Sequence, residues 1–215
     1  MDMPDETSLS STPAEPQSLR GRERYTRIIA SATELFLRDG YSETSIDRIL
    51  DLSGGSKATL YSYFPTKDDL FRAVTESVVE NDRQPELDAH EDILVTLKAF
   101  AEQRLNVIFS PSHRALLRVV IAERQKFPDL ARAYYDAGPK RSRELVADYL
   151  SNLSAEGKLI VDDPREAAGI FIGMLIHEWY SRSLLLDAEP PPEDEVRHRA
   201  DVVARLFIKA YGRSE

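Results

Sequence analysis

The chain contains no cysteine, which excludes disulfide bonds and thiolate metal sites. Its four histidines, at positions 90, 113, 177 and 198, are scattered, so we expect no metal site and no cofactor. The longest apolar run covers residues 167–176, well short of the roughly 20 residues that a membrane-spanning helix needs. The N-terminus is acidic and rich in Ser and Pro, unlike a secretion signal. We therefore expect a cytoplasmic protein without a membrane partner.

The patterns of common catalytic sites are also missing. No Gly-rich phosphate-binding loop follows a strand pattern, and no nucleophile lies beside a candidate general base. His177 and Glu178 are adjacent, but no second histidine follows at the spacing of a zinc protease. The sequence therefore does not predict an enzyme.

Acidic residues outnumber basic ones: the chain has 37 Asp and Glu and 28 Lys and Arg, which gives a net charge of −9. This total argues at first against a nucleic-acid partner, but its distribution softens that objection. Residues 18–72 hold nine bases and eight acids and form the only segment that is not acidic. Because phosphate contacts depend on local charge, this segment is compatible with DNA binding inside an acidic protein.

What the sequence does contain is helical periodicity. Apolar residues recur every three or four positions along most of the chain, without a convincing strand or an internal repeat. We expect an all-α fold of about nine helices, near residues 25–39, 45–53, 56–64, 66–81, 91–109, 114–126, 128–153, 162–186 and 193–211. Residues 1–19 read as a disordered tail, 20–66 as a three-helix domain and 67–215 as a larger helical domain.

Residues 54–64 are the most informative segment. A double glycine ends one short helix and Ser56 caps the next, which is the pattern of a helix-turn-helix whose second helix, 56–64, enters the major groove. Its first turn would place three side chains at the base edges, and later polar side chains at phosphates. We assign Lys57, Ala58 and Thr59 to bases, Tyr61, Tyr63 and Lys67 to phosphates, and Leu60 and Phe64 to the core. An ordinary helical hairpin with a solvated face remains the alternative.

Residues 24–71 resemble the TetR (tetracycline-repressor-like) family of regulators. The resemblance rests on Ile28-Ile29, Ala32, Leu35-Phe36, Gly40-Tyr41, Thr44-Ser45-Ile46, Ile49, Gly54, Ser56-Lys57, Thr59-Leu60-Tyr61, Phe64, Lys67 and Leu70-Phe71. Residues matching Thr44 or Ser45 commonly face DNA in that family, and Arg20-Gly21-Arg22 looks like its basic arm. The resemblance and the reading above together imply a DNA-binding set of Arg20, Arg22, Arg27, Thr44, Ser45, Ser56, Lys57, Ala58, Thr59, Tyr61, Ser62, Tyr63 and Lys67.

Two positions depart from that family's pattern. Gly55 stands where a valine is usual, and Tyr25 stands where an arginine is frequent. We expect Arg24 or Arg27 to take over the phosphate contact that is lost at Tyr25.

The second half resembles an AefR-like C-terminal domain of the same family, which implies an effector cavity and a dimer interface. The resemblance rests on residues 123–139, with Pro128-Asp129-Leu130-Ala131, and on Gly157-Lys158-Leu159 with Asp163-Pro164. Mixed polar and apolar side chains of the middle helices are the candidate ligand contacts. They are Phe100, Arg104, Leu117, Ile121, Arg124, Tyr134, Phe171, Met174, His177 and Glu178.

The last two helices read as the dimer interface. The helix at 165–186 is apolar over much of its girth, so it needs burial on several sides. We expect Ile170, Met174, Trp179, Val196, Val203 and Phe207 to meet a second copy of the chain in a two-fold bundle. A two-fold homodimer would read an inverted-repeat operator, with recognition helices about 34–36 Å apart.

These expectations combine into a ligand-responsive transcriptional repressor. A small, largely apolar effector binds the helical body, the helix at 66–81 moves like a lever, and DNA affinity falls by linkage. The alternative is a helical small-molecule-binding or interaction protein that does not use DNA.

Overall fold

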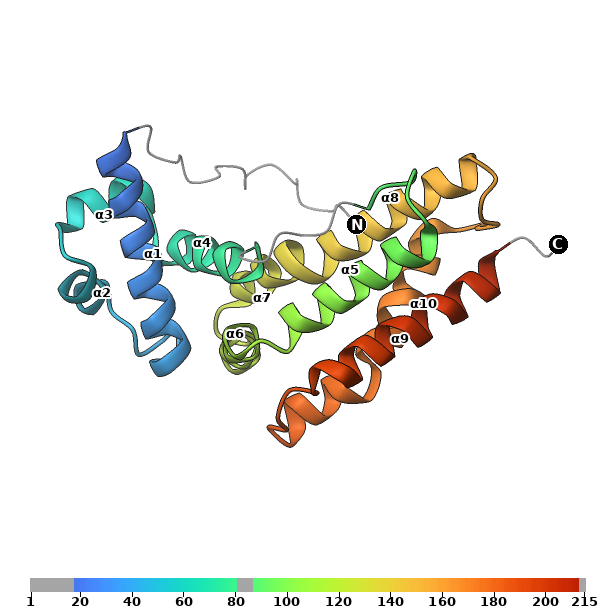
Figure 1. The fold of residues 1–215 in the computed structure, drawn as a ribbon. Helices are drawn as coiled ribbons and strands as arrows, with labels where there is room; N and C mark the ends of the chain where they lie inside the picture. Colours follow the sequence, from blue (N-terminus) through green and yellow to red (C-terminus); the bar gives the residue numbers. More distant parts are fainter. Residues whose placement is uncertain (1–17, 81–86, 213–215) are drawn as a thin grey trace, which may run out of the picture. The chain divides into compact units, whose positions relative to one another are not determined.

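The computed structural model describes residues 18–80 and 87–212. The predicted tail at residues 1–17 lies outside this range. The chain divides into two compact units, Met1–Val74 and Thr75–Glu215. Within the described residues the secondary structure is helical apart from an isolated bridge between Leu159 and Gly212, so the predicted all-α fold is confirmed (Figure 1).

The first unit consists of three helices and the start of a fourth. They are α1 (Leu19–Asp39), α2 (Ile46–Ser53), α3 (Lys57–Tyr63) and α4 (Lys67–Glu80), which passes from the first unit into the second. Serine starts each of the first three: the hydroxyls of Ser18, Ser45 and Ser56 accept from backbone N–H groups three residues ahead. Because Ser18 caps α1, this helix begins six residues before the predicted start at Tyr25.

The core of the first unit is aromatic. Tyr41 stacks on Phe36 at a ring-centroid distance of 5.5 Å and meets the edge of Phe71 at 5.3 Å. Leu60 and Phe64 are fully buried, as predicted, and they fix α3 to this core. The direction in which α3 faces solvent follows from these two anchors.

The second unit contains the remaining helices: α5 (Ile93–Ile108), α6 (Pro111–Glu123), α7 (Pro128–Tyr135), α8 (Arg141–Ala155), α9 (Pro164–Leu185) and α10 (Glu193–Tyr211). Proline occupies the first position of α6, α7 and α9, where its missing N–H costs no intrahelical bond. A π-helical segment, η1 (Asp136–Lys140), joins α7 to α8 and contains Pro139. This π-helical segment lies within the helix predicted near residues 128–153, so α7, η1 and α8 form one continuous stretch.

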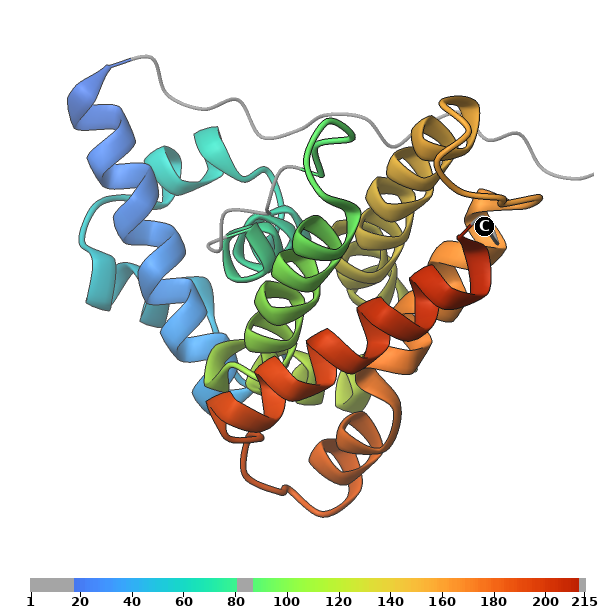
Figure 2. The ribbon, with the colours of Figure 1, turned by 45° about the vertical axis from the view of Figure 1, so that its right-hand side comes forward.

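α5, α8, α9 and α10 enclose the main core, with α10 lying across α5 and beside α9 (Figure 2). Phe171 of α9 packs between Phe100 of α5 and Phe207 of α10, at ring-centroid distances of 6.3 and 5.2 Å. Helical geometry breaks within α9 at His177, where φ is 18° and ψ is −123°. The two halves of α9 therefore run in different directions.

This core corrects part of the predicted interface and part of the predicted ligand set. Val196, Val203 and Phe207 are buried inside the subunit, so they do not form an exposed face for a partner. Phe100 and Phe171 are likewise fully packed among core side chains. No helix in the described part of the chain combines the length and apolarity needed to cross a membrane.

Candidate nucleic-acid interface and ligand cavity

The turn before α3 depends on both of its glycines. Gly54 and Gly55 have φ values of 72° and 109°, a region that strains any residue with a side chain. A Cβ at Gly55 would also lie 3.1 Å from Nη1 of Arg24 on α1. A valine would be both strained and crowded here, which accounts for the glycine at this departure from the family pattern.

One face of α3 is open to solvent. Lys57, Ala58 and Ser62 are exposed, and 44% of the surface of Tyr61 is accessible. Thr59 is half-buried, with its hydroxyl 3.0 Å from that of the capping Ser56. The first turn of α3 is thus presented in the way that a helix needs in order to reach base edges.

Lys57 is not free in the DNA-free protein. Its ammonium lies 2.8 Å from the Asp47 carboxylate on α2, and this hydrogen bond raises the pKa of Lys57. Both side chains are more than half exposed, so the pair is solvent-screened. DNA must therefore compete with Asp47 for Lys57, which is predicted to contact a base.

Two predicted DNA contacts have structural roles instead. Thr44 is buried, and its hydroxyl donates to the carbonyl of Gly40 at 2.8 Å. The Lys67 ammonium donates to the carbonyl of Tyr41 and lies 4.1 Å from the centroid of the Tyr41 ring. Both side chains hold the loop after α1 in place; Thr44 is too buried to contact DNA, whereas Lys67 is half-buried.

The basic residues near the N-terminus belong to α1 and not to an extended arm. Arg20 and Arg22 lie in the first helical turn and are exposed, as is Arg27. Arg20, Arg24 and Arg27 share one face by their spacing, and Arg24 touches the turn before α3. This basic face therefore lies beside the start of the candidate recognition helix.

Packing contacts account for the tyrosine at position 25. Its ring stacks on Phe64 at 5.0 Å and meets the edge of Tyr63 at 5.8 Å. Tyr63 is consequently half-buried, and its ring serves the junction between α1 and α3.

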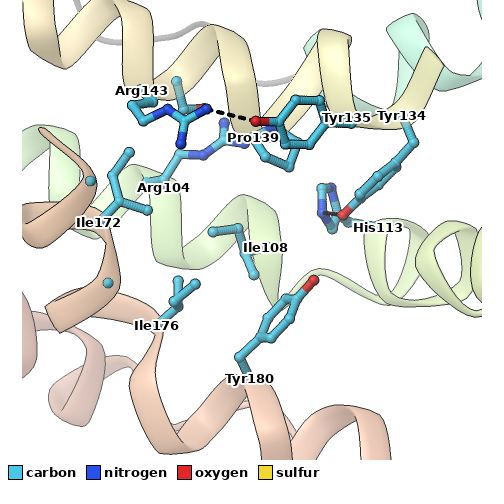
Figure 3. A pocket seen from close by; sticks show the side chains of 13 residues that line it. Arg104, Ile108, His113, Tyr134, Tyr135, Pro139, Arg143, Ile172, Ile176 and Tyr180 are labelled. Carbon is cyan, nitrogen blue, oxygen red and sulfur yellow. Dashed lines mark hydrogen bonds between the residues drawn. The ribbon is translucent and has the colours of Figure 1, made fainter. Parts of the chain in front are cut away.

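The second unit holds a cavity of about 280 Å³ (Figure 3). Its lining comes from five α-helices, α5 to α9, and from η1. Aliphatic and aromatic side chains make up most of the wall, and Figure 3 shows Ile108, Ile176 and Tyr180 converging on it. The lining residues are Arg104, Ile108, His113, Tyr134, Tyr135, Pro139, Ser142, Arg143, Gly169, Ile172, Gly173, Ile176 and Tyr180.

A hydrogen-bonded pair forms one polar edge of the cavity. The hydroxyl of Tyr134 lies 2.7 Å from Nε2 of His113, and both side chains are buried. Burial, together with the charge of Arg104, lowers the pKa of His113 to about 4. Burial raises the pKa of Tyr134 far above its ordinary value. Both groups are therefore neutral at pH 7.

Two arginines line the cavity, and Arg104 is the buried one. Only 6% of its surface is accessible, and burial lowers its pKa. Arg143 lies at the other side of the wall, where its guanidinium donates to the Tyr135 hydroxyl at 2.6 Å. Tyr135 and Arg143 also line a polar hollow, so this pair lies between the cavity and that hollow.

The structure brings only part of the predicted ligand set together. Arg104 and Tyr134 line the cavity, whereas Leu117 is core and Ile121 and Arg124 are exposed on or just after α6. The other lining residues, among them Ile108, His113, Ile176 and Tyr180, were not predicted. Helical spacing alone does not distinguish a side chain of the cavity wall from one of the core.

A second surface lies between α9 and α10. Ile170, Val202 and Leu206 are exposed aliphatic residues, with 44%, 37% and 53% of their surfaces accessible. A shallow hollow beside them is lined in part by three residues that were predicted to bind ligand, Met174, His177 and Glu178. Trp179 is half-buried beneath the guanidinium of Arg199, 4.8 Å from its ring centroid.

Two family models match the chain. The model for bacterial regulatory proteins of the tetR family covers residues 28–74, and that for the C-terminal domain of AefR-like transcriptional repressors covers residues 95–213. The first match contains α2, α3 and most of α1, and the second contains the whole cavity lining.

Individual relatives agree with these models. The chain is 24% identical over 190 residues to YvkB, an uncharacterised HTH-type transcriptional regulator of Bacillus subtilis, covering 85% of this chain and 94% of that protein. It is 26% identical over 200 residues to TcmR of Streptomyces glaucescens, covering 83% and 84%.

Among solved structures, a TetR-family regulator from Mesorhizobium loti is 26% identical, with a TM-score of 0.79 over 92% of this chain and all of that chain. A second, named flavonoid-responsive regulator FrrA, is 32% identical, with a TM-score of 0.75 over 91% of this chain and all of that chain.

Proposed function

The chain belongs to the TetR family of DNA-binding transcriptional regulators, and from this premise we propose that it is a dimeric repressor released from an inverted-repeat operator by a small organic effector. The observation that carries the proposal is the path from cavity to α4. Pro139 of η1 lines the cavity, and the adjacent Gly138 is buried against Val79 of α4. Because α4 continues into the first unit, a ligand that moves η1 acts on the helix that enters the DNA-binding head.

The head supports sequence-specific binding through α3. Lys57, Ala58 and Thr59 occupy its first turn, and the basic face of α1 supplies cations for phosphates. The matched family and this exposed helix both favour a regulator over a helical binding protein that does not use DNA.

The effector site is the cavity of the second unit. Its mainly apolar wall and its few convergent polar groups are typical of small-molecule sites. FrrA, whose name describes it as flavonoid-responsive, has the same fold, so a planar, mainly apolar organic molecule is the class of effector to test first.

Dimerisation would use the exposed faces of α9 and α10. Ile170, Val202 and Leu206 offer aliphatic surface that the subunit leaves uncovered. Sedimentation velocity should show a dimer, and Leu206→Glu should shift it toward monomer. Val95→Glu places the same charge on an equally exposed aliphatic of α5 and serves as the matched control. If both variants remain dimeric, α9 and α10 do not form the interface.

Operator binding tests the central claim. The DNA upstream of the gene would be searched for an inverted repeat, and binding to it and to scrambled DNA measured by fluorescence anisotropy across a salt series. Affinity should fall steeply with salt and favour the repeat. Lys57→Ala and Thr59→Ala should alter base preference, whereas Arg27→Ala should weaken binding to every sequence about equally. Equal losses from all three would contradict the base-reading role of α3.

A further inference from the structure

The positive charge of Arg104 has no negative partner among the residues that the structure describes. Its guanidinium has no ion-pair or hydrogen-bond partner among the described residues, although its side chain is almost fully buried. Arg114 shows the usual arrangement: its side chain is also largely buried, and it contacts Asp187 at 3.0 Å and Ser183 at 3.0 Å. Arg104 is therefore an exception that needs a physical reason.

A buried cation without a counter-charge is unfavourable, because it loses hydration and gains nothing in exchange. Arginine cannot escape this cost by losing its proton at pH 7, even where burial lowers its pKa. An external group that supplies a negative charge would remove this cost. The guanidinium fork fits two oxygen atoms of a carboxylate, or one phenolate oxygen, with charge-assisted hydrogen bonds.

The remaining wall of the cavity contains no acid that could serve instead. It presents isoleucines, Pro139, the rings of Tyr134 and Tyr180, and the guanidinium of Arg143, which already donates to the Tyr135 hydroxyl. At about 280 Å³ the cavity exceeds the roughly 150 Å³ that accommodates a benzene ring in a protein core. The space around Arg104 therefore suits an apolar body of one or two rings.

The outer hollow does not select charge. It mixes Lys140, Arg143 and Arg165 with Asp136, Glu144 and Glu166. Inside the cavity, Arg143 already donates to Tyr135, which leaves the buried Arg104 to discriminate between charged and neutral ligands.

We propose that the effector is an aromatic organic anion whose carboxylate or phenolate oxygen pairs with the Arg104 guanidinium, while its rings contact Ile108, Ile176 and Tyr180. This inference rests on the proposed role of the cavity as the effector site. It narrows that role to a ligand class.

Isothermal titration calorimetry with matched probes tests the anion. Benzoate, 2-naphthoate and biphenyl-4-carboxylate are each compared with their carboxamides at pH 7.5, and 4-nitrophenolate is compared with 4-nitroanisole. At least one anion should bind about tenfold or more tightly than its neutral counterpart, given the strength of charge-assisted hydrogen bonds. The carboxylate pairs and the phenolate pair report separately which oxygen the site prefers. Equal affinities in every pair, or no binding by any anion, would overturn the inference.

Variants assign the preference to one residue. Arg104→Met should abolish the preference for the anion, and Arg104→Lys, which keeps the charge, should retain part of it. Arg124→Met removes an exposed arginine outside the cavity lining and should leave the preference unchanged. Circular dichroism would show that each variant is folded. A preference that survives in Arg104→Met would refute the pairing.

Operator binding measured with and without the anion separates the two claims. If an anion binds through Arg104 but operator affinity does not change, the anion site stands and the proposed ligand response fails. If only neutral aromatic compounds release the operator, the response stands and the anion inference fails.

Discussion

Lowering the pH from 7 to 5 should destabilise the folded chain through His113. This side chain is buried between α6 and α7 and bonded to Tyr134 through one ring nitrogen. Its other nitrogen, Nδ1, is buried and has no hydrogen-bond partner within the described structure. Burial first, and the nearby Arg104 charge second, lower the pKa of His113 from 6.5 to about 4.

The sign of this pH effect follows from the pH at which the folded and the unfolded chain each bind a proton at His113. The unfolded chain is protonated at this histidine below about pH 6.5, whereas the native protein resists protonation until about pH 4. The contribution of neutral His113 to stability is therefore complete above pH 6.5 and is lost as the pH falls from 6.5 to about 4. At 1.36 kcal/mol per pKa unit, the total is about 3 kcal/mol, of which about 2 kcal/mol is lost by pH 5.

Urea unfolding followed by circular dichroism at pH 7.0 and 5.0 measures this loss. The protein concentration is held fixed, because oligomerisation also affects apparent stability. Wild type should lose about 2 kcal/mol more than His113→Gln, since all other titrating groups are common to both. His198→Gln, which removes an exposed histidine of α10, should behave as wild type. The same pH dependence in wild type and His113→Gln would refute the reasoning.

Three further predictions concern single residues. Asp47→Asn should tighten DNA binding about two- to fivefold at low salt by releasing Lys57, and fluorescence anisotropy should show no such gain when Lys57 is already alanine. Gly55→Ala should lower the free energy of unfolding by about 1–3 kcal/mol because of its φ of 109°, and an unchanged urea midpoint would mean that the turn relaxes. Arg104→Met should raise the melting temperature by roughly 2–8 °C without ligand, because it removes an unpaired buried charge; a lower value would indicate a partner for the guanidinium.

The helices and the head could be read from the sequence because their signals are local. Ser45 and Ser56 cap α2 and α3 at the predicted positions, and Leu60 and Phe64 are the predicted anchors. The predicted start of the first helix lies six residues after the observed one, because Gly21 and the arginines around it lack apolar periodicity. A serine cap at Ser18 was the available signal, and it lies where composition suggested a tail.

The interface and the cavity were harder because their signals are not local. Val202 and Val203 are adjacent on an amphipathic helix, and only packing against α5 and α9 shows that Val203 is buried and Val202 exposed. The break at His177 also changes which side chains of α9 turn inward. Neither proline nor glycine marks that break, so the place of Tyr180 in the cavity followed only from the three-dimensional arrangement.

The continuity of α4 has a mechanical consequence. Its 14 residues span about 21 Å, so a tilt of about 5° at one end displaces the other by about 2 Å. Displacements of that size are within the range of helix shifts in switching proteins. Under the proposed ligand response, a shift of η1 at Val79 would tilt α4 and displace its other end by a distance of this order.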